Sequence, residues 1–368
     1  MVRPYNFGPG PAQLPDEVLI KASDELMNWK STGMSSMELG HRGSDFKQII
    51  SRATESATKL LNLPSTHKLL FMQGGARGQN AIVPMNLLNE SLLCDFVITG
   101  YWSEQTAKEA KKYGVVNVAA SSTKNYTSIP SPESWKINKN TSYVHICSNE
   151  TVHGVEFFEW PDLNIIGRGH VPLVVDMSSN ILSKNMDFEN IGLAYASAQK
   201  NIGPAGLTLV IIEESLLNNR DNRGLGICPS VFDYRNLIET TSLYNTPPTY
   251  SIYMAGLMFD WLIKKGGIDE IEKTNLEKSK LLYEALDLSN FYQTPVTDKF
   301  RSRVNVPFFL PNQDLNDIFI EGAKKQGLIN LKGHSALGGL RASLYNSMPI
   351  EGVKALVNWL KEFENIYG

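Results

Sequence analysis

The sequence predicts an α/β protein: a large domain with a seven-stranded, mostly parallel sheet covered by helices, and a smaller C-terminal α+β domain. Up to about residue 215, short apolar runs alternate with helix-like segments, which is typical of a parallel sheet with helices on both faces. After about residue 250 the pattern changes to longer helices with a few short strands between them.

Seven apolar runs are expected to form the large sheet. Helical stretches separate most of them, as parallel pairing requires. The last two runs are joined instead by a short Gly-Pro-x-Gly turn, so we expect a hairpin and one antiparallel strand there. The runs are residues 68–73, 95–100, 115–120, 143–147, 172–177, 193–198 and 207–212.

The later part of the chain is expected to form the small domain. The stretch YSIYMAGLMFDWLIKKGG reads as a helix that ends at its glycines, and a charged helix follows at 268–286. Near the C-terminus, Pro349 precedes a helix with one apolar stripe. We therefore predict three parts: an N-terminal segment at 1–15 that packs with the small domain, a large domain at 16–265, and a small domain at 266–368.

The composition is that of an ordinary globular protein. Of the 368 residues, 42% are hydrophobic and 20% charged, and the formal net charge of −3 gives no indication of a nucleic-acid or membrane partner. The three cysteines are too few and too widely spaced for a disulfide framework or a zinc site, so we expect no metal centre. The N-terminus lacks the apolar stretch of a signal peptide, and no run reaches the length of a membrane span. We therefore expect a cytoplasmic protein.

Small and polar residues follow several predicted strands, at the edge where parallel α/β sheets bind ligands. The first strand is followed by GGARGQN (74–80), the second by Trp102, and the fourth by Thr151. Asp176 lies at the end of the fifth strand, and Lys200 follows the sixth. A single lysine in such a place is most often a solvated surface residue. The combination of glycines, an aromatic ring, a hydroxyl, a carboxylate and a lysine instead indicates a binding site.

These residue types match the needs of pyridoxal phosphate. That cofactor takes a lysine in Schiff-base linkage, a carboxylate at its pyridine nitrogen, backbone donors at a helix N-terminus for its phosphate, and a flat ring for stacking. Asp176 and Lys200 end neighbouring runs, so we expect them on opposite sides of a small ring. The carboxylate would hold the charge of the ring nitrogen, and the freed lysine would carry the substrate's α-proton.

The motifs VVDMSS, SAQKNIGPAGLT and GGARGQN resemble those of class V aminotransferases, which are fold type I enzymes that depend on pyridoxal phosphate. Further motifs run from end to end of the chain: NFGPGPAQLP, MELGHRG, GYW, SNETVHG, SLYNTPPT and GGLRASLYN. Together they resemble the members of that family that transfer an amino group between glutamate and 3-phosphohydroxypyruvate, giving 3-phosphoserine and 2-oxoglutarate in serine biosynthesis. The resemblance also allows activity on 4-phosphohydroxythreonine, in pyridoxine biosynthesis.

The resemblance implies roles for residues around the cofactor. Lys200 would form the Schiff base and Asp176 would pair with the pyridine nitrogen. Trp102 would stack on the ring, and Thr151 would bind near its 3′ oxygen. Part of the phosphate site would come from a second subunit, so the expected assembly is a homodimer with shared active sites. The phosphate-binding residues would be Ala76, Arg77 and Gln199 and, from the second subunit, Asn245 and Thr246.

On the substrate side, the resemblance implies that Arg341 binds the α-carboxylate. A dianionic phosphate requires several cations, and arginine offers planar, paired donors. Where the family often has His-Arg a few residues before its final GGMRAS motif, this chain has GHSALGGLRAS, with Ser335 in the place of the arginine. We therefore expect weaker phosphate binding there, or compensation by another cation such as Lys332. The residues implied around the substrate phosphate are His41, Arg42, Arg77 and His334.

Three alternatives remain open from the sequence. The glycines after the first strand and Asp95 about 20 residues later are reminiscent of a dinucleotide-dependent oxidoreductase, although the order is GGxxG and Asp95 precedes its strand. A cysteine desulfurase would need a mobile, low-pKa thiol; Cys94 and Cys147 lie in or beside apolar runs, and Cys228 lies in a loop without a desulfurase-like motif. A non-catalytic binding module of the same fold is the third, and the presence of Lys200 disfavours it.

Overall fold

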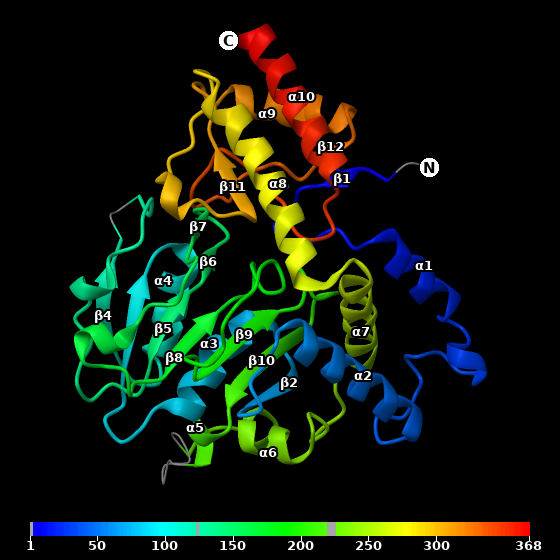
Figure 1. Cartoon of the computed structure of the whole chain (residues 1–368), viewed down its shortest axis with the longest axis vertical. Coiled ribbons are helices and arrows are strands. Elements are labelled where there is room, and N and C mark those ends of the chain that lie inside the picture. Colours follow the sequence, from blue (N-terminus) through cyan, green and yellow to red (C-terminus); the bar gives the residue numbers. More distant parts are fainter. Residues whose placement is uncertain (1–2, 123–124, 219–225) are drawn as a thin grey trace.

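The computed structural model describes residues 3–122, 125–218 and 226–368; residues 1 and 2 of the predicted N-terminal segment therefore lie outside the description. Figure 1 shows a lower body built around a sheet and a smaller upper part that contains the C-terminal helix. The predicted α/β class, with a seven-stranded sheet, is confirmed.

The large sheet has the strand order β2-β10-β9-β8-β5-β3-β4. The predicted hairpin is present: β10 pairs antiparallel with β9 and with β2, whereas the remaining neighbours pair in parallel. The second predicted run extends too far, because β3 ends at Ile98 and Gly100 is the N-cap of the next helix. The strands are β2 (His67–Gln73), β3 (Leu93–Ile98), β4 (Val115–Ser121), β5 (Val144–Cys147), β8 (Leu173–Asp176), β9 (Leu193–Ser197) and β10 (Leu207–Glu213).

Helices cover both faces of this sheet, which explains why its strands read as continuous apolar runs. In β10, Leu209 and Ile211 belong to a core packed against α2 and α7, whereas Val210 and Ile212 belong to a second core beneath α3 and α4. Successive side chains of a strand point to opposite faces, so every position of β10 meets apolar neighbours. The covering helices are α2 (Ser44–Leu60), α3 (Gly75–Leu87), α4 (Tyr101–Ala110) and α7 (Thr249–Lys264).

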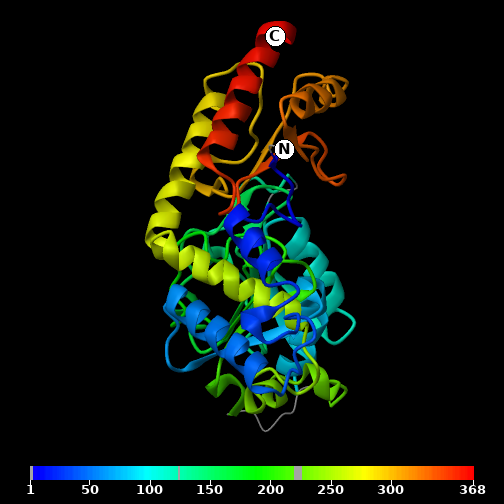
Figure 2. The same ribbon diagram turned by 90° about the vertical axis from the view of Figure 1, so that its right-hand side faces the viewer.

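The upper part has its own apolar core, which includes Phe7 from the N-terminal segment. The helices α8 and α10 run side by side along it in both views (Figures 1 and 2), and α8 also reaches down to the lower core through Ile268 and Ile271. Its elements are α8 (Gly267–Asp287), α9 (Leu315–Lys325), α10 (Ile350–Tyr367), the antiparallel pair β11 (Asn305–Phe308) and β13 (Leu340–Ser343), and the parallel pair β1 (Tyr5–Asn6) and β12 (Leu328–Ile329).

The apolar stripe predicted for the C-terminal helix is buried in this upper core. The remaining short elements are α1 (Asp16–Asp24), α5 (Ser215–Asn218), α6 (Tyr234–Glu239), β6 (Asn149–Glu150) and β7 (Val155–Glu156). Two of them, the helices α5 and α6, pack against the large sheet at the end of the lower body away from the upper part (Figure 1).

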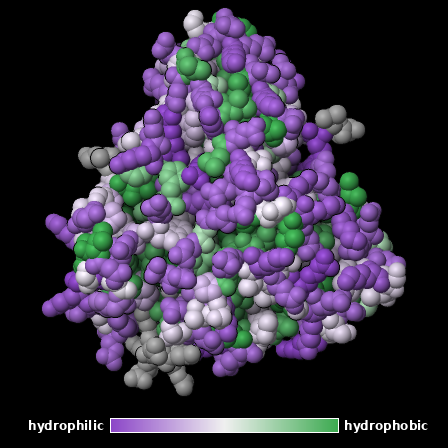
Figure 3. Space-filling view, viewed as in Figure 1, coloured by the Kyte–Doolittle hydropathy of each residue, from purple (hydrophilic) through white to green (hydrophobic). Residues whose placement is uncertain are grey.

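The outer surface is mainly polar on the face shown in Figure 3, where hydrophobic residues form small scattered groups among hydrophilic ones. Across the described residues, none of the helices combines the length and the apolar character needed to cross a membrane.

Candidate active site

A cavity of about 390 Å³ lies at the carboxyl ends of the parallel strands, between the large sheet and β13. It brings together most of the residues that the sequence singles out. Four do not line it: His41, Arg42, Asn245 and Thr246 lie elsewhere on this chain. The predicted residues that line the cavity are Ala76, Arg77, Trp102, Thr151, Asp176, Gln199, Lys200, His334 and Arg341.

Lys200 lies just beyond the end of β9, where the chain turns back into β10. Only 8% of its surface is exposed, and its Nζ donates a hydrogen bond to Thr151 Oγ1 at 2.8 Å. Burial lowers the pKa of this amine to about 8, against the opposing effect of Asp176. At pH 7 about a tenth of the amine is therefore neutral and able to act as a nucleophile or a base, far more than for an ordinary lysine.

Asp176 is the last residue of β8, the strand beside β9. Its Oδ1 accepts a hydrogen bond from the Ser178 backbone N–H at 2.9 Å. Burial raises the pKa of this carboxyl, while the bonds from Ser178 and the charge of Lys200 oppose that rise. A buried carboxylate of this kind is stabilised by a cationic partner, such as a protonated ring nitrogen.

A glycine-lined wall leaves room for a phosphate group at the start of α3. Gly74 and Gly75 have φ angles of 107° and 70°, and a Cβ on Gly75 would lie 3.3 Å from Ser197 Oγ. Opposite them, Gly10 has a φ of 121°, and a Cβ there would lie 3.2 Å from the Gln199 side chain. The first N–H groups of α3 have no acceptor within the helix, so they provide donors for an anion.

The remaining wall is cationic. Arg341 is 4% exposed; its Nη1 donates to the Thr151 carbonyl at 3.2 Å, and its Nε is buried without a partner among the described residues. The Arg77 guanidinium lies 5.3 Å from the Trp102 ring. Burial, together with Arg341 and Arg77, lowers the pKa of His334. The unpaired donor and this concentration of positive charge fit a substrate with more than one acidic group.

The cavity also contains residues that the sequence reasoning did not assign. Asn149, Ser178 and Gly10 line it, each within a motif from which another residue or none was selected. These motifs could have indicated that the three residues belong to the site. The sequence alone does not show which residues of a motif point into the cavity. Ser335 and Lys332 are exposed and do not line the cavity, so Lys332 offers no compensating charge in this arrangement.

The alternatives derived from the sequence find no support in the geometry. Cys147 lines the cavity, but burial raises the pKa of its thiol well above the ordinary value. Burial likewise raises the pKa values of Cys94 and Cys228 to about 11, so none of these thiols is activated. Asp95 is fully buried within β3, where it accepts hydrogen bonds from Asn117 and the Asn138 N–H, and it is not available to a ribose.

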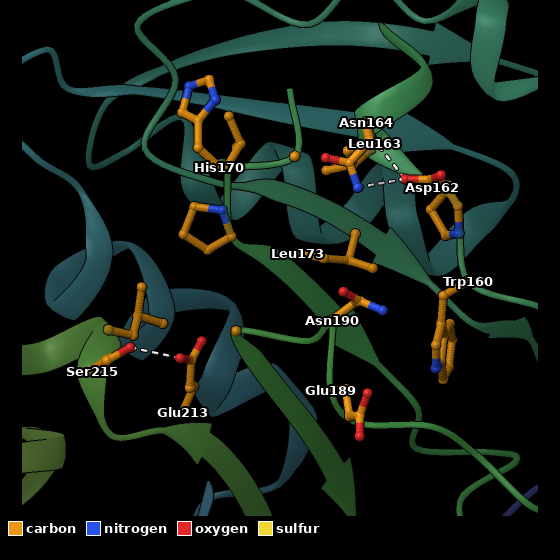
Figure 4. Close-up of a pocket in the computed structure, with 16 residues that line it drawn as sticks. Trp160, Asp162, Leu163, Asn164, His170, Leu173, Glu189, Asn190, Glu213 and Ser215 are labelled. Carbon is orange, nitrogen blue, oxygen red and sulfur yellow. Dashed lines mark hydrogen bonds between the residues drawn. The ribbon is translucent and has the colours of Figure 1, made fainter. Parts of the chain in front are cut away.

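A second, larger hollow of about 560 Å³ lies at the opposite edge of the same sheet (Figure 4). Its polar groups make short-range bonds: Asn164 donates to Asp162, and Ser215 donates to Glu213. Among the residues that the structure describes, those lining this hollow include no lysine or arginine, so they offer neither a Schiff-base amine nor a strong anion site.

The family model for aminotransferase class-V matches residues 4–356. The chain is 50% identical over 365 residues to a phosphoserine aminotransferase of Paraburkholderia phytofirmans, with 99% of both chains covered, and 50% identical over 372 residues to one of a Janthinobacterium species, with 100% of both covered. Among solved structures, a phosphoserine aminotransferase of Bacillus circulans subsp. alkalophilus has a TM-score of 0.94 at 41% identity, covering 100% of this chain and 99% of that one.

The fold and the cavity thus define a pyridoxal-phosphate-dependent enzyme. This chain belongs to the class-V aminotransferases. A further structural relative, the phosphoserine aminotransferase of Trichomonas vaginalis, was solved with that cofactor bound; its TM-score is 0.92 at 38% identity, covering 98% of this chain and 100% of that one.

Proposed function

We propose that the protein transfers an amino group from glutamate to 3-phosphohydroxypyruvate, giving 2-oxoglutarate and 3-phosphoserine in serine biosynthesis. The names of the relatives at 50% identity support this reaction. The observation that carries it is the presence, in one cavity, of the buried pair Lys200 and Asp176 together with Arg77, His334 and Arg341. The first pair suits the cofactor, and the cationic group suits a substrate that carries both a carboxylate and a phosphate.

Each residue has a separate task in this proposal. Pyridoxal phosphate supplies an aldehyde that takes up the amino group and a conjugated ring that accepts electrons from the substrate. Asp176 holds the proton on the ring nitrogen, and Trp102 packs on the ring face. Arg341 binds the α-carboxylate and thereby orients the α-carbon, whose proton Lys200 Nζ removes and returns. The side-chain carboxylate of glutamate takes the place of the substrate phosphate, so one cationic wall serves both substrates.

The donors at the start of α3 hold the cofactor phosphate. Thr151 would bind the ring oxygen, and the hydrogen bond that its hydroxyl accepts from Lys200 Nζ supports this assignment. The cofactor-binding residues that we propose within one subunit all line the cavity: Ala76, Arg77, Trp102, Thr151, Asp176, Gln199 and Lys200.

The proposal includes a homodimer in the cytoplasm, with domains at 16–265 and 266–368. Large hydrophobic side chains are exposed in the segment that precedes His41 and Arg42: Ile20 is 60% exposed, Met27 81% and Met37 52%. A second copy covering this segment would bury that apolar surface. The same contact would let the residues that lie outside the cavity complete it from the partner, namely His41, Arg42, Asn245 and Thr246.

Mixing two inactive variants tests the shared site. Lys200→Ala and Arg42→Glu subunits are mixed in equal amounts and allowed to exchange. About half of the dimers are then mixed, and each mixed dimer has one intact site out of two, so about a quarter of the wild-type activity should return. Mixtures that stay inactive after subunit exchange, shown by a tagged copy, would contradict the shared site.

Steady-state kinetics on 3-phosphohydroxypyruvate and on unphosphorylated hydroxypyruvate, with glutamate as donor, test the reaction. We expect kcat/KM to be about 100-fold or more higher for the phosphorylated substrate, because losing a dianion leaves the cationic wall unpaired. Equal values for the two substrates would refute the phosphate site. Lys200→Ala should abolish both the activity and the visible absorbance band of the lysine-bound cofactor.

A further inference from the structure

The first turn of α4, which carries Trp102, rests on residues 150–153. The Tyr101 N–H donates to His153 Nδ1 at 3.2 Å, and the Trp102 N–H donates to a Glu150 carboxylate oxygen at 2.9 Å. The Ser103 N–H donates to the other Glu150 oxygen at 2.8 Å. These three donors are among the four that an α-helix leaves without internal partners at its start.

This arrangement replaces the usual cap of a helix. An N-cap side chain normally accepts from these N–H groups, but the N-cap of α4 is Gly100, which has none. Glu150 is fully buried and also accepts from Ser103 Oγ at 2.6 Å. A Cβ on Gly100 would lie 2.4 Å from the Glu150 carboxyl carbon, so the carboxylate packs directly against the backbone of the turn. A buried negative charge at a helix N-terminus is electrostatically favourable.

The same four residues also carry Thr151, whose hydroxyl accepts from Lys200 Nζ and whose carbonyl accepts from Arg341. The cap of α4 therefore connects Trp102, whose ring would stack on the cofactor, to Thr151, whose hydroxyl would bind near the cofactor's ring oxygen. On the outer side, Tyr101 lies 4.8 Å from the His334 ring, which links the cap to the cationic wall. Burial lowers the pKa of His153 to about 4, so its ring is neutral and its Nδ1 is free to accept near neutral pH.

We propose that Glu150 and His153 are positioning residues, which hold the first turn of α4 so that Trp102 stays at a fixed distance from Thr151 and Lys200. Neither side chain lines the cavity, so both act through the residues that they hold. The inference rests on the proposed function only for the identity of the cofactor. It predicts that loosening the cap changes how the cofactor is held, beyond any general loss of stability.

The test compares holoenzymes of Glu150→Gln, His153→Phe and His153→Asn with a matched control, Asp95→Asn. Asp95 is an equally buried carboxylate that accepts backbone and side-chain bonds far from the cavity. The readouts are the dissociation constant of pyridoxal phosphate and the circular dichroism of its visible band per bound cofactor. In Glu150→Gln an amide donor faces a backbone donor, so we expect cofactor binding to weaken about 3- to 30-fold and the dichroism to change.

His153→Phe should, like Glu150→Gln, weaken cofactor binding and change the visible dichroism, because it removes the acceptor for the Tyr101 N–H. His153→Asn should restore them in part, because its amide oxygen accepts from the same N–H. Asp95→Asn should lower the melting temperature and leave both readouts at the wild-type values.

Wild-type cofactor affinity and dichroism in Glu150→Gln and His153→Phe would overturn the inference, as would equal changes in Asp95→Asn. If Glu150→Gln does not fold, the His153→Phe and His153→Asn pair decides: identical readouts in the two variants would overturn it, and rescue by asparagine would support it. A wild-type protein that binds no pyridoxal phosphate would instead refute the proposed function.

Discussion

Lys278 provides a prediction whose size follows from the structure. This lysine is fully buried in α8, and its Nζ donates to three backbone carbonyls, those of Tyr345 at 2.9 Å, Met348 at 3.1 Å and Leu344 at 3.3 Å. The three carbonyls belong to the connection between β13 and α10. The lysine therefore joins the long helix to the segment that follows Arg341.

Burial lowers the pKa of Lys278 from 10.5 to about 7. Because the pKa is lower in the folded protein than in the unfolded chain, the unfolded chain binds more protons between these two values. The free energy of unfolding therefore rises with pH across this window, and the contribution is lost as the pH falls through the lower value. Between about pH 7 and pH 9, one such group contributes a rise of about 2 kcal/mol.

Lys278→Met removes the titrating group while keeping an apolar stem of similar length. We expect the wild type to gain about 2 kcal/mol relative to the variant between about pH 7 and pH 9, as measured by denaturant unfolding at several pH values. The control is Lys280→Met, because Lys280 lies on the same helix with its side chain 75% exposed. Parallel stability curves for the wild type and Lys278→Met would refute the reasoning, and so would an equal effect of Lys280→Met.

Three further predictions concern the cavity. Asp176→Asn should lower kcat about 100-fold or more with the cofactor still bound, because an amide does not hold the charge of the ring nitrogen; a kcat within tenfold of the wild-type value would argue against that role. Arg341→Lys should raise KM for both the amino-group donor and the acceptor about 10- to 100-fold, because an ammonium group cannot make the two parallel hydrogen bonds that a guanidinium makes to a carboxylate. Unchanged KM values would show that the α-carboxylate binds elsewhere. Ser335 itself does not line the cavity but directly follows His334, which does, so the longer side chain of Ser335→Arg should lower KM for the phosphorylated substrate about fivefold and leave that for hydroxypyruvate unchanged. If the first KM does not fall, an arginine at position 335 does not reach the phosphate.

Most strands of the large sheet could be predicted because both of their faces are buried; the edge strand β4 is partly exposed. In β10 the run LTLVII is apolar at five of its six positions, with Thr208 as the exception, and this produces a signal that is independent of its neighbours. The ligand-binding edge followed from the same logic, since parallel strands bring their carboxyl ends together. The sequence therefore predicts that Asp176 and Lys200 share one site, and both line the same cavity.

The cap of α4 was not predictable in the same way. Gly100 offers no capping side chain, and nothing in the local sequence shows that Glu150 and His153 replace it. The interaction exists only because β3 and β5 are neighbours in the sheet, although the chain visits β4 between them. Such a cap depends on tertiary structure, so local start signals for a helix do not reveal it.

The burial of Lys278 and Glu150 could not be predicted from the sequence of this chain. Lys278 and Glu150 are charged residue types that usually lie at the surface, and the periodicity of α8 gives Lys278 no special status. Both are buried because backbone groups, rather than oppositely charged side chains, satisfy them. Backbone carbonyls and N–H groups occur at every position, so their availability is decided by the fold alone. A charged residue satisfied in this way is therefore visible only once the fold is known, and it is at such residues that substitutions should test the structure most severely.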